Sequence, residues 1–191
     1  MKRTAWYRGA ISIVLLLLSS FSFAVVASSG SEHTSVQWKS WPTVGKAQLS
    51  WFMFDIYESR LKAPGGTYQL ADDITPHALA LQIDYQRNIS RDELLNATAE
   101  QWKQLGYSST RYRPWLAALS GLFPDISKGD QLIYVTDGVE GSLWYAERNH
   151  APKVVGLVSD ETLNDAFLSI WLSPRSQYPE LRKQLIGMHT K

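Results

Sequence analysis

The sequence predicts an α+β fold in which a mainly antiparallel sheet packs on a layer of helices. The first observation is the element order, which is strands, helices, a hairpin, one more strand and further helices. A parallel sheet would need strict alternation of strand and helix. The second is turn chemistry at Asp137-Gly138 between two alternating runs, which is typical of a β-hairpin. The third is the length of 191 residues with 45% hydrophobic and 19% charged residues, which fits one globular domain.

The N-terminal segment predicts export. Residues 1–9 carry three basic and no acidic side chains, an apolar run follows at 11–18, and small residues dominate 19–30. This order is typical of a signal peptide, and we expect residues 1–27 to be removed after Ala27, with Ala24 as the alternative site. The apolar run is shorter than the roughly 20 residues that span a bilayer, which argues against an uncleaved anchor.

Cleavage would place the protein in the periplasm or outside the cell. Lys and Arg number 19 and Asp and Glu 18, so loss of three basic residues changes the net charge from +1 to about −2. The chain has no cysteine, so it has neither disulfides nor the thiol that a lipoprotein anchor needs. After cleavage we therefore expect no stable membrane anchor.

The mature chain is expected to begin with a lead-in segment at 28–43 and a domain at 44–191. Residues 44–61 are rich in aromatic and β-branched side chains and predict one strand, or two strands with a turn near Lys46 or Ser50. The stretch 51–54 is apolar on both faces, so we expect it to be covered on both sides. Ala63-Pro-Gly-Gly66 ends the strand.

Residues 79–86 alternate between apolar and polar and predict a half-buried strand. Ser90-Arg-Asp-Glu93 is a capping box that begins a helix, and apolar residues up to Leu105 recur on one helical face. Pro114 is typical of the first turn of a second helix, which Phe123-Pro124 ends.

The C-terminal third predicts a hairpin, a strand and two helices. Strands are expected at 130–136, 142–147 and 154–158. Ser159 is expected to cap a helix that Ser173-Pro174 ends. Pro179 begins a last helix, and Gly187 ends it. We expect Trp102, Trp115 and Trp171 to pack in the core because they lie on these helical faces.

Several chemistries lack a signature. The four histidines are far apart in the sequence, and no metal-ligand spacing or nucleotide-binding motif occurs. The near-neutral net charge gives no electrostatic basis for nucleic-acid binding. We therefore expect no cofactor, no metal and no nucleic-acid partner.

Asp55 stands out because it lies in a run that is otherwise apolar. Counting by twos places Asp55 and Tyr57 on one face of the strand, where they would form the polar floor of an apolar pocket. The alternative is that Asp55 lies beyond the buried stretch and pairs with a basic residue such as Arg87. Arg60 and Arg87 are either anchors for an anionic ligand or ordinary surface residues.

Three groups of segments together resemble the chalcone isomerase-like family. Residues 44–49 and 54–64 resemble the opening strands of that family. Residues 81–90, which lead into the helix that holds Trp102, resemble its next strand and helix. The C-terminal helices are represented by 167–174 and 181–187. The resemblance spans about residues 43–187 and is nearest to an exported bacterial branch. It implies an open-faced β-sandwich with a ligand cleft between sheet and helices.

The resemblance also implies two functions known in the family, cofactor-free cyclisation of a chalcone and fatty-acid binding. The arginine of the catalytic pattern falls near Gln48, where only Lys46 offers a cation, and the threonine falls near Tyr57. The tyrosine at the start of the helix falls near Ser90, and the asparagine falls near Ala97, with Asn96 one position away. The main electrostatic group for enolate stabilisation is therefore missing.

The sequence thus favours an exported, non-catalytic protein that binds a hydrophobic or amphipathic small molecule such as a fatty acid. The alternatives are an isomerase or lyase acting on an enone-like substrate, and an envelope accessory protein without a ligand. The candidate ligand-binding residues are Gln48, Asp55, Tyr57, Arg60 and Asn96, and no catalytic residue is assigned.

Overall fold

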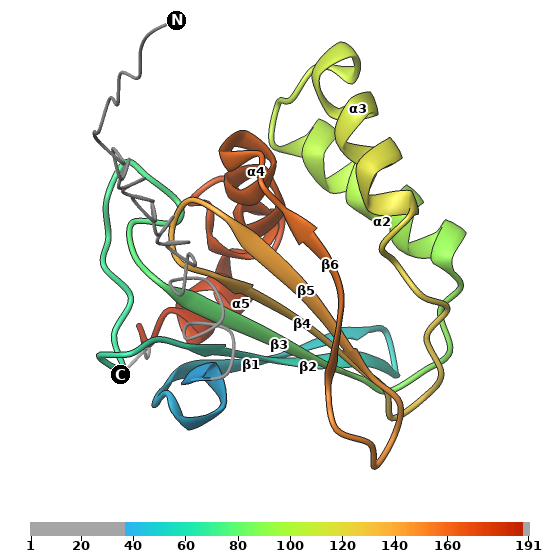
Figure 1. Ribbon diagram of the computed structural model, residues 1–191, viewed down its shortest axis with the longest axis horizontal. Coiled ribbons are helices and arrows are strands. Elements are labelled where there is room, and N and C mark those ends of the chain that lie inside the picture. Colours follow the sequence, from blue (N-terminus) through green and yellow to red (C-terminus); the bar gives the residue numbers. More distant parts are fainter. Residues whose placement is uncertain (1–36, 189–191) are drawn as a thin grey trace, which may run out of the picture.

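The computed structural model describes residues 37–188, so the expected signal peptide and its cleavage site lie outside the described residues. The sheet has six strands, each paired antiparallel with its neighbours in chain order (Figure 1). This confirms the α+β prediction. The strands are β1 Thr43–Trp51, β2 Phe54–Lys62, β3 Leu79–Tyr85, β4 Gln131–Thr136, β5 Gly141–Ala146 and β6 Lys153–Val158.

Among the described residues, four α-helices are present, and they lie on one face of this sheet (Figure 1). They are α2 Arg91–Gln104, α3 Ser109–Ser120, α4 Glu161–Leu172 and α5 Pro179–Leu185. A short 3₁₀ helix, η1 Trp38–Ser40, packs on the other face, where Trp38 and Trp41 form a small buried cluster with residues of β3, β4 and β5. The second half of the expected lead-in segment therefore contributes to the fold.

The helix ends follow the capping rules, and two helix starts differ from their predicted positions. The Ser90–Glu93 capping box is present at the start of α2, as predicted. The N-cap of α4 is Asp160 rather than Ser159, because the Asp160 carboxylate accepts from the N–H groups of Thr162 and Leu163. Pro114 lies inside α3 and not in its first turn, since the helix already begins at Ser109.

The β1–β2 connection corrects the prediction for 51–54. Trp51 pairs with Phe54, and a tight turn at Phe52-Met53 joins the strands. All four side chains are exposed rather than covered on both sides. The apolar run misled the prediction because a hairpin tip leaves the sheet and meets no second layer.

The main core lies between the sheet and the helices. Trp102 is fully buried and its indole N–H donates to the Ala166 carbonyl of α4 at 2.6 Å. Trp115 packs edge-on against Trp102, with ring centroids 5.4 Å apart. The predicted core role of these tryptophans is confirmed. None of the helices formed by the described residues is long and apolar enough to span a bilayer.

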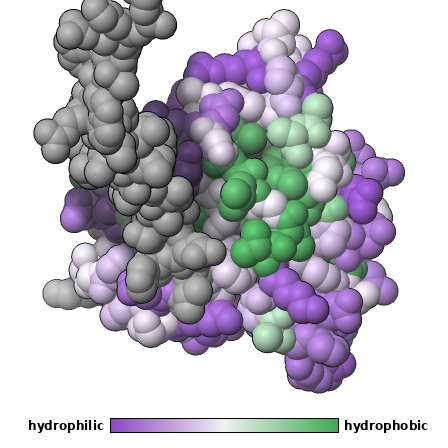
Figure 2. All heavy atoms as spheres, in the orientation of Figure 1, coloured by the Kyte–Doolittle hydropathy of each residue, from purple (hydrophilic) through white to green (hydrophobic). Residues whose placement is uncertain are grey.

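Strand β6 forms the far edge of the sheet and is apolar on its exposed side. Val154, Val155 and Leu157 are all exposed there. Figure 2 shows apolar side chains gathered at the middle of the face in view, over the region where Figure 1 places β6.

Candidate functional site

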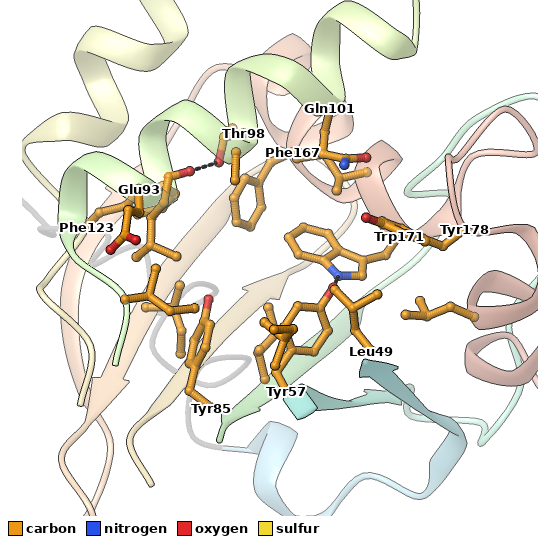
Figure 3. Close-up of a pocket in the computed structure, with 18 residues that line it drawn as sticks. Leu49, Tyr57, Tyr85, Glu93, Thr98, Gln101, Phe123, Phe167, Trp171 and Tyr178 are labelled. Atoms are coloured by element: carbon orange, nitrogen blue, oxygen red, sulfur yellow. Dashed lines mark hydrogen bonds between the residues drawn. The ribbon is translucent and has the colours of Figure 1, made fainter. Parts of the chain in front are cut away.

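An apolar pocket of about 180 Å³ lies between the sheet and helices α2 and α4 (Figure 3). Strands β1, β2, β3 and β4 form its floor, and α2, α4 and the start of α5 form its walls. Its exposed lining residues are Glu93, Ala97 and Tyr178, so the pocket meets solvent between α2, the β1–β2 hairpin and α5. The lining residues are Leu49, Ile56, Tyr57, Ile83, Tyr85, Ile89, Glu93, Leu94, Ala97, Thr98, Gln101, Phe123, Leu132, Phe167, Ile170, Trp171, Tyr178 and Leu181.

A tyrosine–tryptophan pair joins the floor to α4. The indole N–H of Trp171 donates to the Tyr57 hydroxyl at 2.9 Å. Burial raises the pKa of Tyr57 well above its ordinary value, and the bond from Trp171 offsets only part of this rise. The phenol therefore stays protonated at neutral pH. Because its oxygen is the acceptor in that bond, its own O–H proton remains to be donated to a ligand.

Tyr85 provides a second hydroxyl beside the first. The two rings pack edge to face with centroids 5.9 Å apart. Tyr85 is 5% exposed, and its hydroxyl makes no hydrogen bond to residues 37–188, yet it is not among the fully buried polar atoms that lack a partner. Figure 3 shows this hydroxyl directed from the sheet toward α2. Burial raises the pKa of Tyr85 strongly, so it too is a neutral donor. The hydroxyl therefore opens onto the pocket, where water or a ligand can accept its hydrogen bond.

Helix α2 supplies the opposite wall. Its lining residues Glu93, Ala97 and Gln101 recur every four positions and therefore lie on one helical face. Thr98 donates to the Leu94 carbonyl at 2.8 Å, and Gln101 donates to Gln177 at 2.8 Å, so both already have partners. Glu93 accepts from the Ser90 N–H in the capping box. Bonding within the helix end thus occupies the one acidic side chain of the lining.

A β-bulge separates Asp55 from the pocket. The register pairs Leu49 with Tyr57 and Ser50 with Asp55, so Ile56 has no partner on β1. This extra residue breaks the alternation on which the common face of Asp55 and Tyr57 depended. Ile56 and Tyr57 both line the pocket, whereas Asp55 is exposed and accepts a 2.6 Å hydrogen bond from Ser50. Asp55 thus lies beyond the buried stretch, with Ser50 rather than Arg87 as its partner.

Three other candidates lie away from the pocket. Gln48 is exposed on β1 and exchanges hydrogen bonds with Gln86, while its neighbour Leu49 lines the pocket. Arg60 forms an ion pair with Glu58 at 3.3 Å. Asn96 is exposed on α2, and Ala97 takes the lining position beside it. Of the five candidates, the structure places Tyr57 alone in the pocket.

The sequence interpretation missed Tyr85 and the role of Trp171. Alternation along 79–85 already placed Tyr85 on the buried face, so a tyrosine hydroxyl among core positions was the available signal. Trp171 was assigned to packing alone, yet its N–H orients Tyr57. No basic residue belongs to the lining formed by the described chain. Among residues 37–188, no group of His, Asp and Glu is placed to hold a metal ion.

A six-stranded antiparallel sheet with one helical layer and an apolar pocket between them defines an open-faced β-sandwich protein. The sequence matches the family described as chalcone isomerase-like over residues 35–187, and the chain belongs to that family. It is 29% identical over 147 residues to an uncharacterized protein of Haemophilus influenzae. That alignment covers 77% of this chain and 68% of the relative.

Proposed function

We propose that the chain is an exported, non-catalytic protein that binds a hydrophobic or amphipathic small molecule. The observation that carries this proposal is the apolar pocket with two neutral tyrosine hydroxyls at its floor. Ligand sites are typically apolar concavities with a few convergent polar groups. Export is supported by the charge and hydrophobicity pattern of residues 1–27.

The enclosed volume limits the part of a ligand that can be held. About 180 Å³ is close to the roughly 150 Å³ cavity that encloses one benzene ring in a well-studied apolar site. We therefore propose that the pocket encloses one ring or a short acyl segment. The remainder of a longer molecule, such as a fatty-acid chain, would lie in the mouth between Ala97 and Tyr178.

The charges of the lining indicate what kind of polar group would bind. Glu93 is the one ionisable acid in the lining, and the described lining offers no cation to pair with a carboxylate. Burying an anion without a cation is unfavourable. Tyr57 and Tyr85 instead offer O–H donors to a neutral acceptor such as a carbonyl or ester oxygen. A fatty acid would bind through these hydroxyls rather than through an ion pair.

Blocking the mouth provides a direct test. We expect Ala97→Trp to weaken binding of a fluorescent fatty acid or fatty-acid ester about tenfold or more, because the indole would occupy the mouth. The matched control is Asn96→Trp, which adds the same side chain one residue away, outside the lining. Fluorescence titration gives the affinities, and circular dichroism checks the fold. Equal affinities for the two variants would contradict the proposed pocket, and failure of the unmodified chain to bind any such molecule would contradict the function.

An isomerase acting on an enone-like substrate is the second candidate. It is favoured by one observation, namely that Tyr57 and Tyr85, packed edge to face, place two hydroxyl donors on the floor of one pocket, where a developing enolate oxygen could accept a hydrogen bond. If the chain is such an isomerase, adding it to a chalcone will make the absorbance of the enone band decay. Tyr57→Phe would then slow turnover about 100-fold, since one such donor commonly contributes two to three orders of magnitude. Absence of turnover by the unmodified chain rejects flavonoid cyclisation.

A further inference from the structure

Four consecutive large apolar side chains are exposed at the tip of the β1–β2 hairpin. Trp51 and Phe54 are each 66% exposed, Phe52 is 87% exposed and Met53 is 93% exposed. Single exposed apolar residues are common on soluble proteins and need no explanation, but a continuous apolar tip indicates an interaction site. We call residues 51–54 the apolar tip.

The fold does not require these residues at the turn. Phe52 has a φ of +55°, in the left-handed region that favours glycine or asparagine. In a two-residue hairpin turn whose first central residue alone has positive φ, glycine is the usual residue at that position. The chain instead has Phe-Met there, and neither side chain packs in a core cluster of the described residues. A role outside the folded domain explains why apolar side chains stand in this unfavourable place.

The apolar tip is continuous with the mouth of the pocket. Leu49 lies two residues before Trp51, Ile56 lies two residues after Phe54, and both line the pocket. The bulge at Ile56 directs this side chain toward the pocket while the strand continues outward to the tip. A surface that contacts the tip would therefore lie next to the entrance for an apolar ligand.

We propose that the apolar tip inserts into the interfacial region of a lipid bilayer and places the pocket mouth against it, an inference that, as regards ligand transfer, rests on the proposed function. Tryptophan and phenylalanine are side chains suited to this region. A bilayer fits better than a protein partner, because the tip is four residues on a convex turn, whereas each side of a stable protein interface contributes roughly 20–30 residues. The tip carries no basic residue, so insertion depends on apolar contact and not on anionic lipid.

A local fluorophore tests insertion at the tip itself. The chain has no cysteine, so Met53→Cys introduces a single site for an environment-sensitive label. The matched control is Leu70→Cys, a residue 62% exposed in the loop that follows the opposite end of β2. With phosphatidylcholine vesicles we expect a blue shift at position 53 and none at 70. Local labels are needed because the apolar run at 11–18 of the full chain would itself bind lipid.

The variant Phe52→Gly with Met53→Asn removes the two most exposed side chains and places glycine at the position of positive φ, as a favoured hairpin turn does. With the label moved to Phe54→Cys, we expect the apparent vesicle affinity reported there to fall about tenfold. An unchanged emission at 53 on vesicle addition would overturn the proposal. So would a concentration-dependent dimer that the double variant abolishes, since this would assign the tip to a second copy.

The double variant also separates this proposal from the proposed function. Equilibrium binding of a soluble fluorescent fatty-acid ester is expected to stay unchanged, because neither substituted residue lines the pocket. The rate of transfer of that ester from vesicles to protein is expected to fall in parallel with vesicle affinity. If position 53 inserts but no ester binds, the tip proposal stands and the ligand-binding function fails. If the ester binds but the transfer rate is the same for both proteins, the role of the tip in ligand transfer is overturned.

Discussion

Gly45→Ala is expected to lower the free energy of unfolding by about 3 kcal/mol, because a Cβ at this position of β1 has no space. An ideal Cβ would lie 2.5 Å from the Leu185 carbonyl oxygen and closer still to that of Gln184. Both atoms belong to the main chain of helix α5, which cannot yield as a flexible side chain would. The substitution would push α5 away from β1, and with it the pocket residue Leu181. Urea unfolding followed by circular dichroism measures the change.

Gly65→Ala is the matched control for this experiment. A Cβ there would meet nothing closer than the Thr67 hydroxyl at 3.8 Å, and the glycine is exposed. We expect its unfolding free energy to stay within about 0.5 kcal/mol of the unmodified chain. If Gly45→Ala proves as mild as Gly65→Ala, the close packing of α5 on β1 is wrong. Ligand affinity should fall in the first variant and not in the second, since Leu181 lines the pocket.

Asp130→Ala is expected to lower the free energy of unfolding by about 3 kcal/mol, because three donors would lose their acceptor. The buried Asp130 carboxylate accepts from the Tyr145 hydroxyl at 2.6 Å and from the N–H groups of Ser127 at 2.8 Å and Arg148 at 2.9 Å. It thereby ties the loop before β4 to the residues that follow β5. The exposed Asp137 also accepts from two N–H groups, so Asp137→Ala is the control, with an expected loss below about 1 kcal/mol.

The same carboxylate makes stability depend on pH. Burial raises the pKa of Asp130, but the hydrogen bonds from Tyr145, Ser127 and Arg148 outweigh it and leave the pKa below its ordinary value. The stabilisation is therefore complete above the unfolded-state pKa near 4 and is lost as the pH falls through the folded-state pKa. In Asp130→Ala, the free energy of unfolding should fall less steeply as the pH decreases through this range. If the free energy of unfolding falls just as steeply in the variant, other groups control the loss of stability at acid pH.

Much of the fold was predictable because its signals are local. Alternation in 79–85, the Asp137-Gly138 turn and the Ser90–Glu93 capping box each depend on neighbouring residues, and all three features are present. At the start of α4, a local rule met a competing local alternative. Asp160 caps α4 in place of Ser159, since either side chain suits an N-cap and the path of the chain selects one.

The pocket was less predictable because it depends on strand register. Counting by twos placed Asp55 and Tyr57 on one face of the strand. The unpaired residue Ile56 breaks this alternation, so that Tyr57 lines the pocket and Asp55 does not. A bulge is a property of two strands together, so a pattern along one strand cannot show it. Tyr85 and Trp171 come from β3 and α4, far apart in the chain, and nothing in either segment indicates that both would meet Tyr57.

The sequence by itself determined the fold class, the start of helix α2 and the family of this protein, because hydrophobic periodicity and the Ser90–Glu93 capping box are encoded within a few residues of each other. Only the tertiary structure decided that residues 51–54 form an exposed tip, that Ala97 rather than Asn96 faces the pocket, and that its floor carries two neutral hydroxyls without a cation. These features depend on how separate elements pack, and packing is set by burial across the whole chain.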